Sequence, residues 1–175
     1  MRFLLFLILT ATLTSCNTNP KKTEKMDNNI AIQQAITNIF IGTDNRDWQN
    51  VTDQFYSEVN LDYSSMTGNS PVMLTPNEII SQWKTVLPGF TFTHHQLGNF
   101  IVKIKDNKAH GFCYGTAGHF LEDPEGSIWT VTGSYDFDLI KVGTSWKVSS
   151  MKFNYKYQNG NSKLIQKAIE KVKSN

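Results

Sequence analysis

Long hydrophobic runs and a strong net charge are both absent from this 175-residue chain. Its first unbroken apolar run, residues 3–9, is far shorter than the ~18–20 residues that a membrane-spanning helix needs. The formal net charge is only +2, and lysines are interspersed with carboxylates except near the C-terminus. This distribution excludes the clustered basic surface that nucleic-acid binding requires, so we expect no nucleic-acid partner.

Sequence signals for bound metals, phosphates and cofactors are missing as well. The chain has no glycine-rich phosphate loop and no nucleophile elbow. His94 and His95 are adjacent, and adjacent side chains on a strand point to opposite faces, so the two cannot share one metal ion. We therefore expect neither a metal nor an organic cofactor.

Cysteine is scarce, with only Cys16 and Cys113 in the whole chain. Cys113 lies in the strand-like segment Gly-Phe-Cys-Tyr-Gly, which favours a buried apolar role over a nucleophilic one. Cys16 follows a positive Arg2, the apolar run and Leu-Thr-Ser, a segment that resembles a bacterial lipobox. If Cys16 carries acyl chains, Cys113 has no partner, and an intramolecular disulfide is excluded.

The lipobox resemblance implies a signal peptide over residues 1–15 and lipidation of Cys16. Residues 16–27 are polar and lack an apolar period, so we expect a flexible tether there. The remaining 28–175 suit one domain, with a core over 28–157 and a closing helix over 162–173. The expected location is outside the cytoplasm, lipid-anchored to a bacterial membrane on the periplasmic face or the cell surface.

Helical patterns come first along the chain and strand patterns follow. Apolar residues at spacings of three and four predict a helix from residue 28 that ends at Gly42, and a second helix begins at Asp47. A short strand over 59–65 and a capped helix over 75–87 come next. Runs of β-branched and aromatic residues then predict four long strands, at 90–105, 109–121, 127–141 and 145–157. This order indicates an α+β domain in which helices cover one face of a curved sheet.

Four separated residues carry the chemistry of an acid–base site: Asp44, Tyr63, His95 and His119. A carboxylate can orient an imidazole, and a phenol and a second imidazole can assist at a carbonyl and a leaving group. Their spacing alone does not bring them together. A structural role for Asp44, as the cap of the helix that follows, remains open.

The face on which His95 lies depends on strand parity. Counting back from Lys103, taken as outward, puts His94 on the core face and His95 outside. A bulge near Gly98 and Asn99 reverses this assignment. We favour His95 as the functional residue and keep His94 as the alternative.

Several strings of the chain carry a family resemblance. They are Asp-Tyr-Ser near Tyr63, Thr-His-His-Gln-Leu-Gly-Asn near His95, Trp-Thr-Val-Thr-Gly-Ser-Tyr-Asp-Phe-Asp-Leu ending at 139, and Gly-Thr-Ser-Trp-Lys-Val after it. With the element order, they resemble the SnoaL-like branch of the nuclear-transport-factor-two-like superfamily over residues 28–157. The resemblance implies a cystatin-like cone, in which about three N-terminal helices pack in the concave face of a strongly curved mixed or antiparallel sheet. It also implies a homodimer.

Within this family, Asp44 and His95 match an Asp–His pair of the scytalone dehydratase and hexachlorocyclohexane dehydrochlorinase branches. Tyr63 and His119 match a Tyr and a second His of the scytalone dehydratase branch. The resemblance thus implies that His95 acts as a general base oriented by Asp44, that Tyr63 polarises a carbonyl, and that His119 donates to a departing hydroxide.

Departures from these two branches leave the substrate open. Gly133 and Tyr135 stand where the scytalone dehydratase branch has Ser and Asn, and Asn154 stands where the dehydrochlorinase branch has an arginine. Tyr135 and Trp129 are candidate ligand-binding residues, with core packing as the alternative for each. Ligand contact is also considered for His94 and Asn99.

The leading hypothesis is a cofactor-independent lyase or isomerase that carries out a dehydratase-type elimination beside a carbonyl. Its ligand would be a small hydrophobic or polyketide-like compound. The alternative is a non-catalytic ligand-binding or interaction lipoprotein that uses the same cone as a scaffold. An acid–base pair in an enclosed pocket favours the first, and a plugged or wide-open cone favours the second.

Overall fold

The computed structural model describes residues 20–174. The predicted signal peptide over 1–15 and the predicted lipidation site Cys16 lie outside these residues. Within them, no helix is long and apolar enough to span a membrane. The elements are α1 (Pro20–Asn45), α2 (Trp48–Gln54), β1 (Phe55–Asp62), α3 (Ser64–Thr67), β2 (Val72–Leu74), α4 (Pro76–Lys84), the 3₁₀ helix η1 (Leu87–Gly89), β3 (Phe92–Lys105), β4 (Lys108–Phe120), β5 (Ile128–Val142), β6 (Ser145–Gly160) and α5 (Leu164–Lys173).

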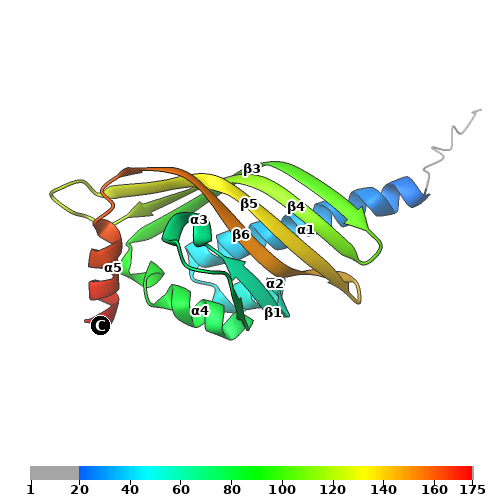
Figure 1. The fold of residues 1–175 in the computed structure, drawn as a ribbon, viewed down its shortest axis with the longest axis horizontal. Helices are drawn as coiled ribbons and strands as arrows, with labels where there is room; N and C mark the ends of the chain where they lie inside the picture. The colour runs from blue at the N-terminus through cyan, green and yellow to red at the C-terminus, as the bar shows by residue number, and fades with distance from the viewer. Residues whose placement is uncertain (1–19, 175) are drawn as a thin grey trace, which may run out of the picture.

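The strands form one mixed, curved sheet in the order β2-β1-β6-β5-β4-β3. β1 and β6 pair in parallel, and all other neighbours are antiparallel. The four long strands arch over α1, while β1, α3 and α4 lie together on the lower side and α5 closes one end (Figure 1). The expected α+β cone, with helices against the concave face of the sheet, is confirmed.

The helix α1 differs from its predicted bounds at both ends. Residues 20–27, expected to belong to a flexible tether, are helical, because lysine, glutamate and methionine have high helix propensity and the segment contains no glycine. At the other end, α1 continues past Gly42 to Asn45. Gly42 serves packing instead: a β-carbon there would lie 2.7 Å from the side chain of Val51, so its absence lets α2 approach α1.

The segment between α2 and α4 was predicted less well. Phe55 begins β1 rather than ending a helix, because it pairs with Val148 of β6. β1 stops at Asp62, earlier than expected, and Tyr63 occupies the position just before the short helix α3. The predicted start of α4 is confirmed: Thr75 and Glu78 form a capping box.

A bulge in β3 decides which histidine faces inward. The register of β3 with β4 shifts between Gly98 and Ile101, and Asn99 adopts a left-handed backbone with φ 56°. Before the bulge the even-numbered residues are outward and His95 is inward, whereas Lys103 beyond it is outward.

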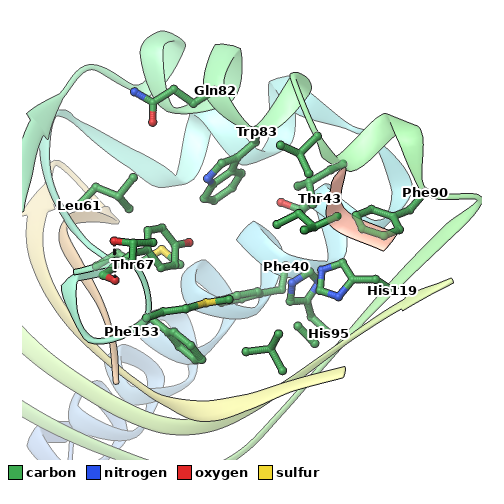
Figure 2. A pocket seen from close by; sticks show the side chains of 18 of the residues that line it. Phe40, Thr43, Leu61, Thr67, Gln82, Trp83, Phe90, His95, His119 and Phe153 are labelled. Atoms are coloured by element: carbon green, nitrogen blue, oxygen red, sulfur yellow. Dashed lines mark hydrogen bonds between the residues drawn. The ribbon is translucent and has the colours of Figure 1, made fainter. Parts of the chain in front are cut away.

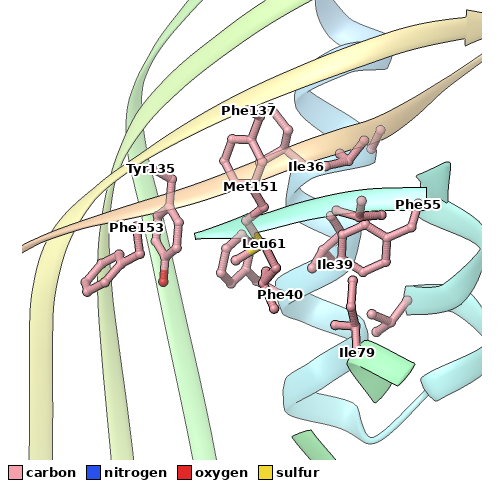
Figure 3. Packing of buried hydrophobic residues seen from close by; sticks show 14 of the residues in the cluster. Ile36, Ile39, Phe40, Phe55, Leu61, Ile79, Tyr135, Phe137, Met151 and Phe153 are labelled. Carbon is pink, nitrogen blue, oxygen red and sulfur yellow. The ribbon is translucent and has the colours of Figure 1, made fainter. Parts of the chain in front are cut away.

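The core fills the space between α1, α4 and the concave face of the sheet. Aliphatic side chains of α1 and α4, including Ile36, Ile39 and Ile79, are fully buried. They pack beside Phe137 of β5 and Met151 of β6 (Figure 3). This apolar core fills part of the cone, and a cavity lies beside it within the same cone.

Candidate active site

Asp44 lies in the last turn of α1 and faces β3. It does not cap α2, because the side chain of Asp47 accepts that hydrogen bond, from the backbone N–H of Asn50. Three donors from β3 reach the Asp44 carboxylate. The Thr93 hydroxyl donates to Oδ1 over 2.8 Å, and the His95 backbone N–H donates to Oδ2 over 2.7 Å. The third, Nδ1 of His95, lies 2.7 Å from Oδ1.

These contacts fix the ionisation of Asp44 and the tautomer of His95. Partial burial alone would raise the pKa of Asp44, but the hydrogen bonds and charge of His95 and the bond from Thr93 together lower it. With Asp44 ionised, Nδ1 of His95 carries a proton, and Nε2 of the neutral ring has a free lone pair. The His95 side chain is only 11% exposed and also packs against Phe40. His95 is therefore equipped to accept a proton at Nε2.

Arg46, two residues after Asp44, closes this corner of the site. Its Nη1 donates to the backbone oxygen of Thr43 over 2.7 Å and to Oγ1 of Thr93 over 3.0 Å. Its Nη2 donates to the backbone oxygen of Leu87 over 2.6 Å. A continuous hydrogen-bonded chain thus runs from Arg46 through Thr93 and Asp44 to His95.

His95 opens onto a cavity of about 350 Å³ between the sheet and the helices. The side chains around it come from every layer of the cone and are mostly apolar or aromatic (Figure 2). Trp83 of α4 and Leu61 of β1 stand opposite the two histidines in this view, and Ile165 of α5 also lines the cavity. The volume suits one small, largely apolar molecule.

Tyr63 and Tyr135 both line this cavity. Burial raises the pKa of both phenols, so each stays protonated and remains a hydrogen-bond donor at neutral pH. Among the described residues, neither hydroxyl has a hydrogen-bond partner within the protein. The two groups are therefore available to a carbonyl oxygen of a bound ligand.

His119 also lines the cavity, and its ring centroid lies 6.1 Å from that of His95. Burial, and then the neighbouring His95, lower the pKa of His119 to about 4. Its Nδ1 lies 3.3 Å from the backbone oxygen of Trp129, and the two rings stack at 4.6 Å. Nδ1 of the neutral ring therefore carries the proton and donates a hydrogen bond to the backbone oxygen of Trp129, which leaves Nε2 as an acceptor. This geometry argues against the predicted donation from His119 to a departing hydroxide.

Two of the candidate ligand-binding residues lie away from the cavity. His94 is exposed on the opposite face of β3, and Asn99 is exposed in the bulge. The alternation of side chains along β3 explains the position of His94, and the bulge explains that of Asn99. Trp129, by contrast, lines the cavity and donates from its ring nitrogen to Oε1 of Gln158 over 2.9 Å.

Neither a metal site nor a reactive thiol accompanies these residues. Within residues 20–174, no group of three or more His, Cys, Asp or Glu side chains could hold a metal ion. Cys113 is fully buried, and burial raises the pKa of its thiol to about 12. A buried apolar role for Cys113, as the sequence suggested, agrees with both observations.

The sequence profile of the SnoaL-like domain matches residues 24–152, which is most of the chain. The chain belongs to the SnoaL-like family. No match is found among curated proteins.

Solved structures share the fold of this SnoaL-like domain. The Kfla4162 protein from Kribbella flavida superposes with a TM-score of 0.76 at 20% identity, covering 81% of this chain and 99% of that one. A hexachlorocyclohexane dehydrochlorinase, LinA-type3 from Novosphingobium barchaimii LL02, gives 0.68 at 14% identity, covering 81% and 94%. A candidate scytalone dehydratase from Novosphingobium aromaticivorans gives 0.67 at 15%, covering 80% and 91%. At these identities the likeness concerns the fold alone.

Sequence reasoning missed Arg46 and Thr93. Thr93 could have been found, because it lies two residues before His95 and so shares its face of β3. Arg46 gave no such signal. It has a left-handed backbone with φ 61°, outside both neighbouring helices, and two of its three hydrogen bonds go to the distant Leu87 and Thr93.

Proposed function

We propose that this SnoaL-like domain is a cofactor-independent lyase or isomerase that acts beside a carbonyl group. The observation that carries the proposal is the 2.7 Å contact between Asp44 and His95 at the wall of an apolar cavity. The proposed substrate is a small hydrophobic or polyketide-like carbonyl compound, because the cavity is small and mostly apolar, and His95, Tyr63 and Tyr135 supply polar groups on its wall.

His95 acts as the general base in this proposal. Its Nε2 removes a proton from the carbon next to the carbonyl, and the ionised Asp44 stabilises the imidazolium that forms. The electron pair of the broken C–H bond moves toward the carbonyl carbon, and negative charge develops on the carbonyl oxygen. The hydroxyl groups of Tyr63 and Tyr135 donate hydrogen bonds to that oxygen, where such donors have their largest effect.

Collapse of this enolate completes the reaction. In an elimination, a carbon–oxygen bond at the next carbon breaks, a carbon–carbon double bond forms, and the His95 imidazolium returns its proton to the leaving hydroxide, which departs as water. In an isomerisation, the same proton returns to a different carbon. Nε2 of His119 accepts a hydrogen bond from a substrate hydroxyl and so orients it. Neither route changes the oxidation state, so neither needs a cofactor.

The proposal includes a location and an assembly. The resemblance of the segment ending at Cys16 to a lipobox supports export and lipid anchoring to a bacterial membrane, on the periplasmic face or the cell surface. A homodimer is proposed by analogy with the superfamily. Mass-spectrometric detection of acyl chains on Cys16 and the molar mass in solution test these two parts separately.

The catalytic proposal is tested by proton exchange, which does not require the natural substrate. A panel of small cyclic ketones and β-hydroxyketones is incubated with the protein in D₂O, and NMR follows exchange of the α-protons and formation of the enone. We expect His95→Gln to reduce the exchange by roughly 10²–10⁴-fold. His110→Gln, on the exposed face of β4, is the matched control. Binding of these ketones without exchange would favour the non-catalytic ligand-binding lipoprotein instead.

A further inference from the structure

We propose that Arg46 and Thr93 are positioning residues, which hold the Asp44 carboxylate and through it the ring of His95 in their working geometry. The proposal rests on the function proposed above but concerns two residues outside the predicted site. It follows from which group donates and which accepts in each hydrogen bond between Arg46, Thr93, Asp44 and His95.

The guanidinium group fixes these directions. Arginine can only donate, so Oγ1 of Thr93 accepts from Nη1 of Arg46 over 3.0 Å. The proton of the Thr93 hydroxyl must then point elsewhere, and Oδ1 of Asp44 lies 2.8 Å away. Oδ1 accepts from Thr93 and from Nδ1 of His95 together. Arg46 therefore sets the orientation of the Thr93 hydroxyl, and that orientation supplies one of the three donors that hold Asp44.

Arg46 also joins the acid–base pair to the cavity wall. Its three acceptors belong to the end of α1, to η1 and to β3. Two of them, Thr43 and Leu87, line the cavity themselves. The backbone of Arg46 is left-handed, which is costly for a residue other than glycine, and its three hydrogen bonds help to hold it there. One side chain thus holds in place both the pair and the wall of the cavity.

The charged and titratable groups that face Asp44 are Arg46 from the α1–α2 connection, His95 from β3 and His119 from β4. Loss of the Thr93 hydroxyl removes one donor to the carboxylate of Asp44 and leaves the two donors of His95 in place. Thr93 is buried, and valine has nearly its shape but no hydroxyl. Valine at this position removes the hydroxyl and keeps the packing, whereas serine keeps the hydroxyl and removes a methyl group. Comparison of the two separates the effect of the hydrogen bond from the effect of packing.

The test measures the protonation of Asp44 directly, without a substrate. In the isotopically labelled protein, the carboxyl ¹³C shift of Asp44 is followed against pH, and long-range ¹H–¹⁵N correlations report which nitrogen of His95 carries the proton. We expect Thr93→Val and Arg46→Met each to increase the proton affinity of Asp44 by about tenfold, because each removes support for the charged form. Thr93→Ser should stay near wild type. Lys103→Met, an exposed charge on the same strand, is the control.

Unchanged titration of Asp44 in Thr93→Val, or failure of serine to restore it, would overturn the proposal. If Arg46→Met does not fold, the valine and serine pair at Thr93 decides alone. If the variants shift the titration of Asp44 but the wild-type protein does not catalyse ketone exchange, the positioning role stands and the proposed function fails. If the wild-type protein catalyses ketone exchange but the variants do not shift the titration of Asp44, the proposed function stands and the positioning role fails.

Discussion

Asp44 accepts hydrogen bonds from both the backbone N–H and the ring of His95, over 2.7 Å in each case. The backbone contact fixes the carboxylate against β3, and the ring contact fixes the imidazole against the carboxylate. A single residue of α1 therefore sets both the position and the tautomer of the base. Because this pair stands at the wall of an apolar cavity, water competes weakly for its hydrogen bonds.

Replacing Asp44 by asparagine should remove this control over the tautomer. The amide can donate to Nδ1 of His95, so the ring proton can move to Nε2, and the lone pair that would accept a substrate proton is lost. We expect a loss of roughly 10²–10⁴-fold in ketone exchange with the fold retained. Ketone exchange by NMR and far-UV circular dichroism measure the two effects.

The matched control for this change is Asp138→Asn. Asp138 lies on β5, its side chain is 64% exposed, and it contacts His110 rather than His95. Exchange should match wild type in this variant. Equal losses in both variants would show that the effect of Asp44→Asn does not come from the pair.

His119 should make the stability of the protein depend on pH. Burial lowers its pKa to about 4, from 6.5 in an unfolded chain, so the unfolded chain binds the proton more readily between these values. The free energy of unfolding should therefore fall as the pH drops from about 6.5 to about 4. At about 1.4 kcal/mol per pH unit, the loss attributable to His119 is roughly 3 kcal/mol.

Urea unfolding at pH 7 and pH 4.5 measures this contribution. His119→Phe keeps an aromatic ring between Phe90 and Trp129 but cannot titrate, so its free energy of unfolding should change less between the two pH values. The same pH dependence in His119→Phe would contradict the assigned neutral state.

The sequence predicted best those elements whose form depends on neighbouring residues in the chain. The strand patterns and the capping signal of Thr75 predicted the long strands and α4, because period and cap chemistry are local properties. His95 faces inward because of the bulge at Gly98–Asn99. The glycine indicated such a bulge, whereas simple alternation along the strand predicted that His95 faces outward.

Elements whose form depends on distant partners were predicted less well. The sequence pattern places Phe55 at the end of an amphipathic helix, but in the fold Phe55 pairs with β6 and belongs to a strand. Two of the three hydrogen-bond acceptors of Arg46, on Thr93 and Leu87, lie more than forty residues away in the chain. Convergence of Asp44 with His95 is likewise a property of the closed cone, and sequence spacing does not contain it.

Gly115 should be needed for the position of Tyr135. A β-carbon at Gly115 of β4 would overlap the ring of Tyr135 on the neighbouring β5. We expect Gly115→Ala to reduce the free energy of unfolding by about 1–3 kcal/mol, because the ring must shift inside a packed core. Gly98→Ala is the control, since nothing lies within 4 Å of a β-carbon there. Urea unfolding of both variants measures the difference, and equal effects would rule out this contact as the cause.

Ala117 should control access of a ligand to the cavity. It lies on β4 between His95 and Val131, and its small side chain leaves room beside the base. In Ala117→Phe the added ring should enter the cavity and weaken binding of 2-naphthol, a flat apolar probe, by at least about tenfold. Fluorescence of Trp83 and Trp129, which line the cavity, reports binding. Thr116→Phe, exposed on the other face of the strand, should bind the probe as wild type does. Undiminished affinity in Ala117→Phe would mean that such ligands bind elsewhere on the protein.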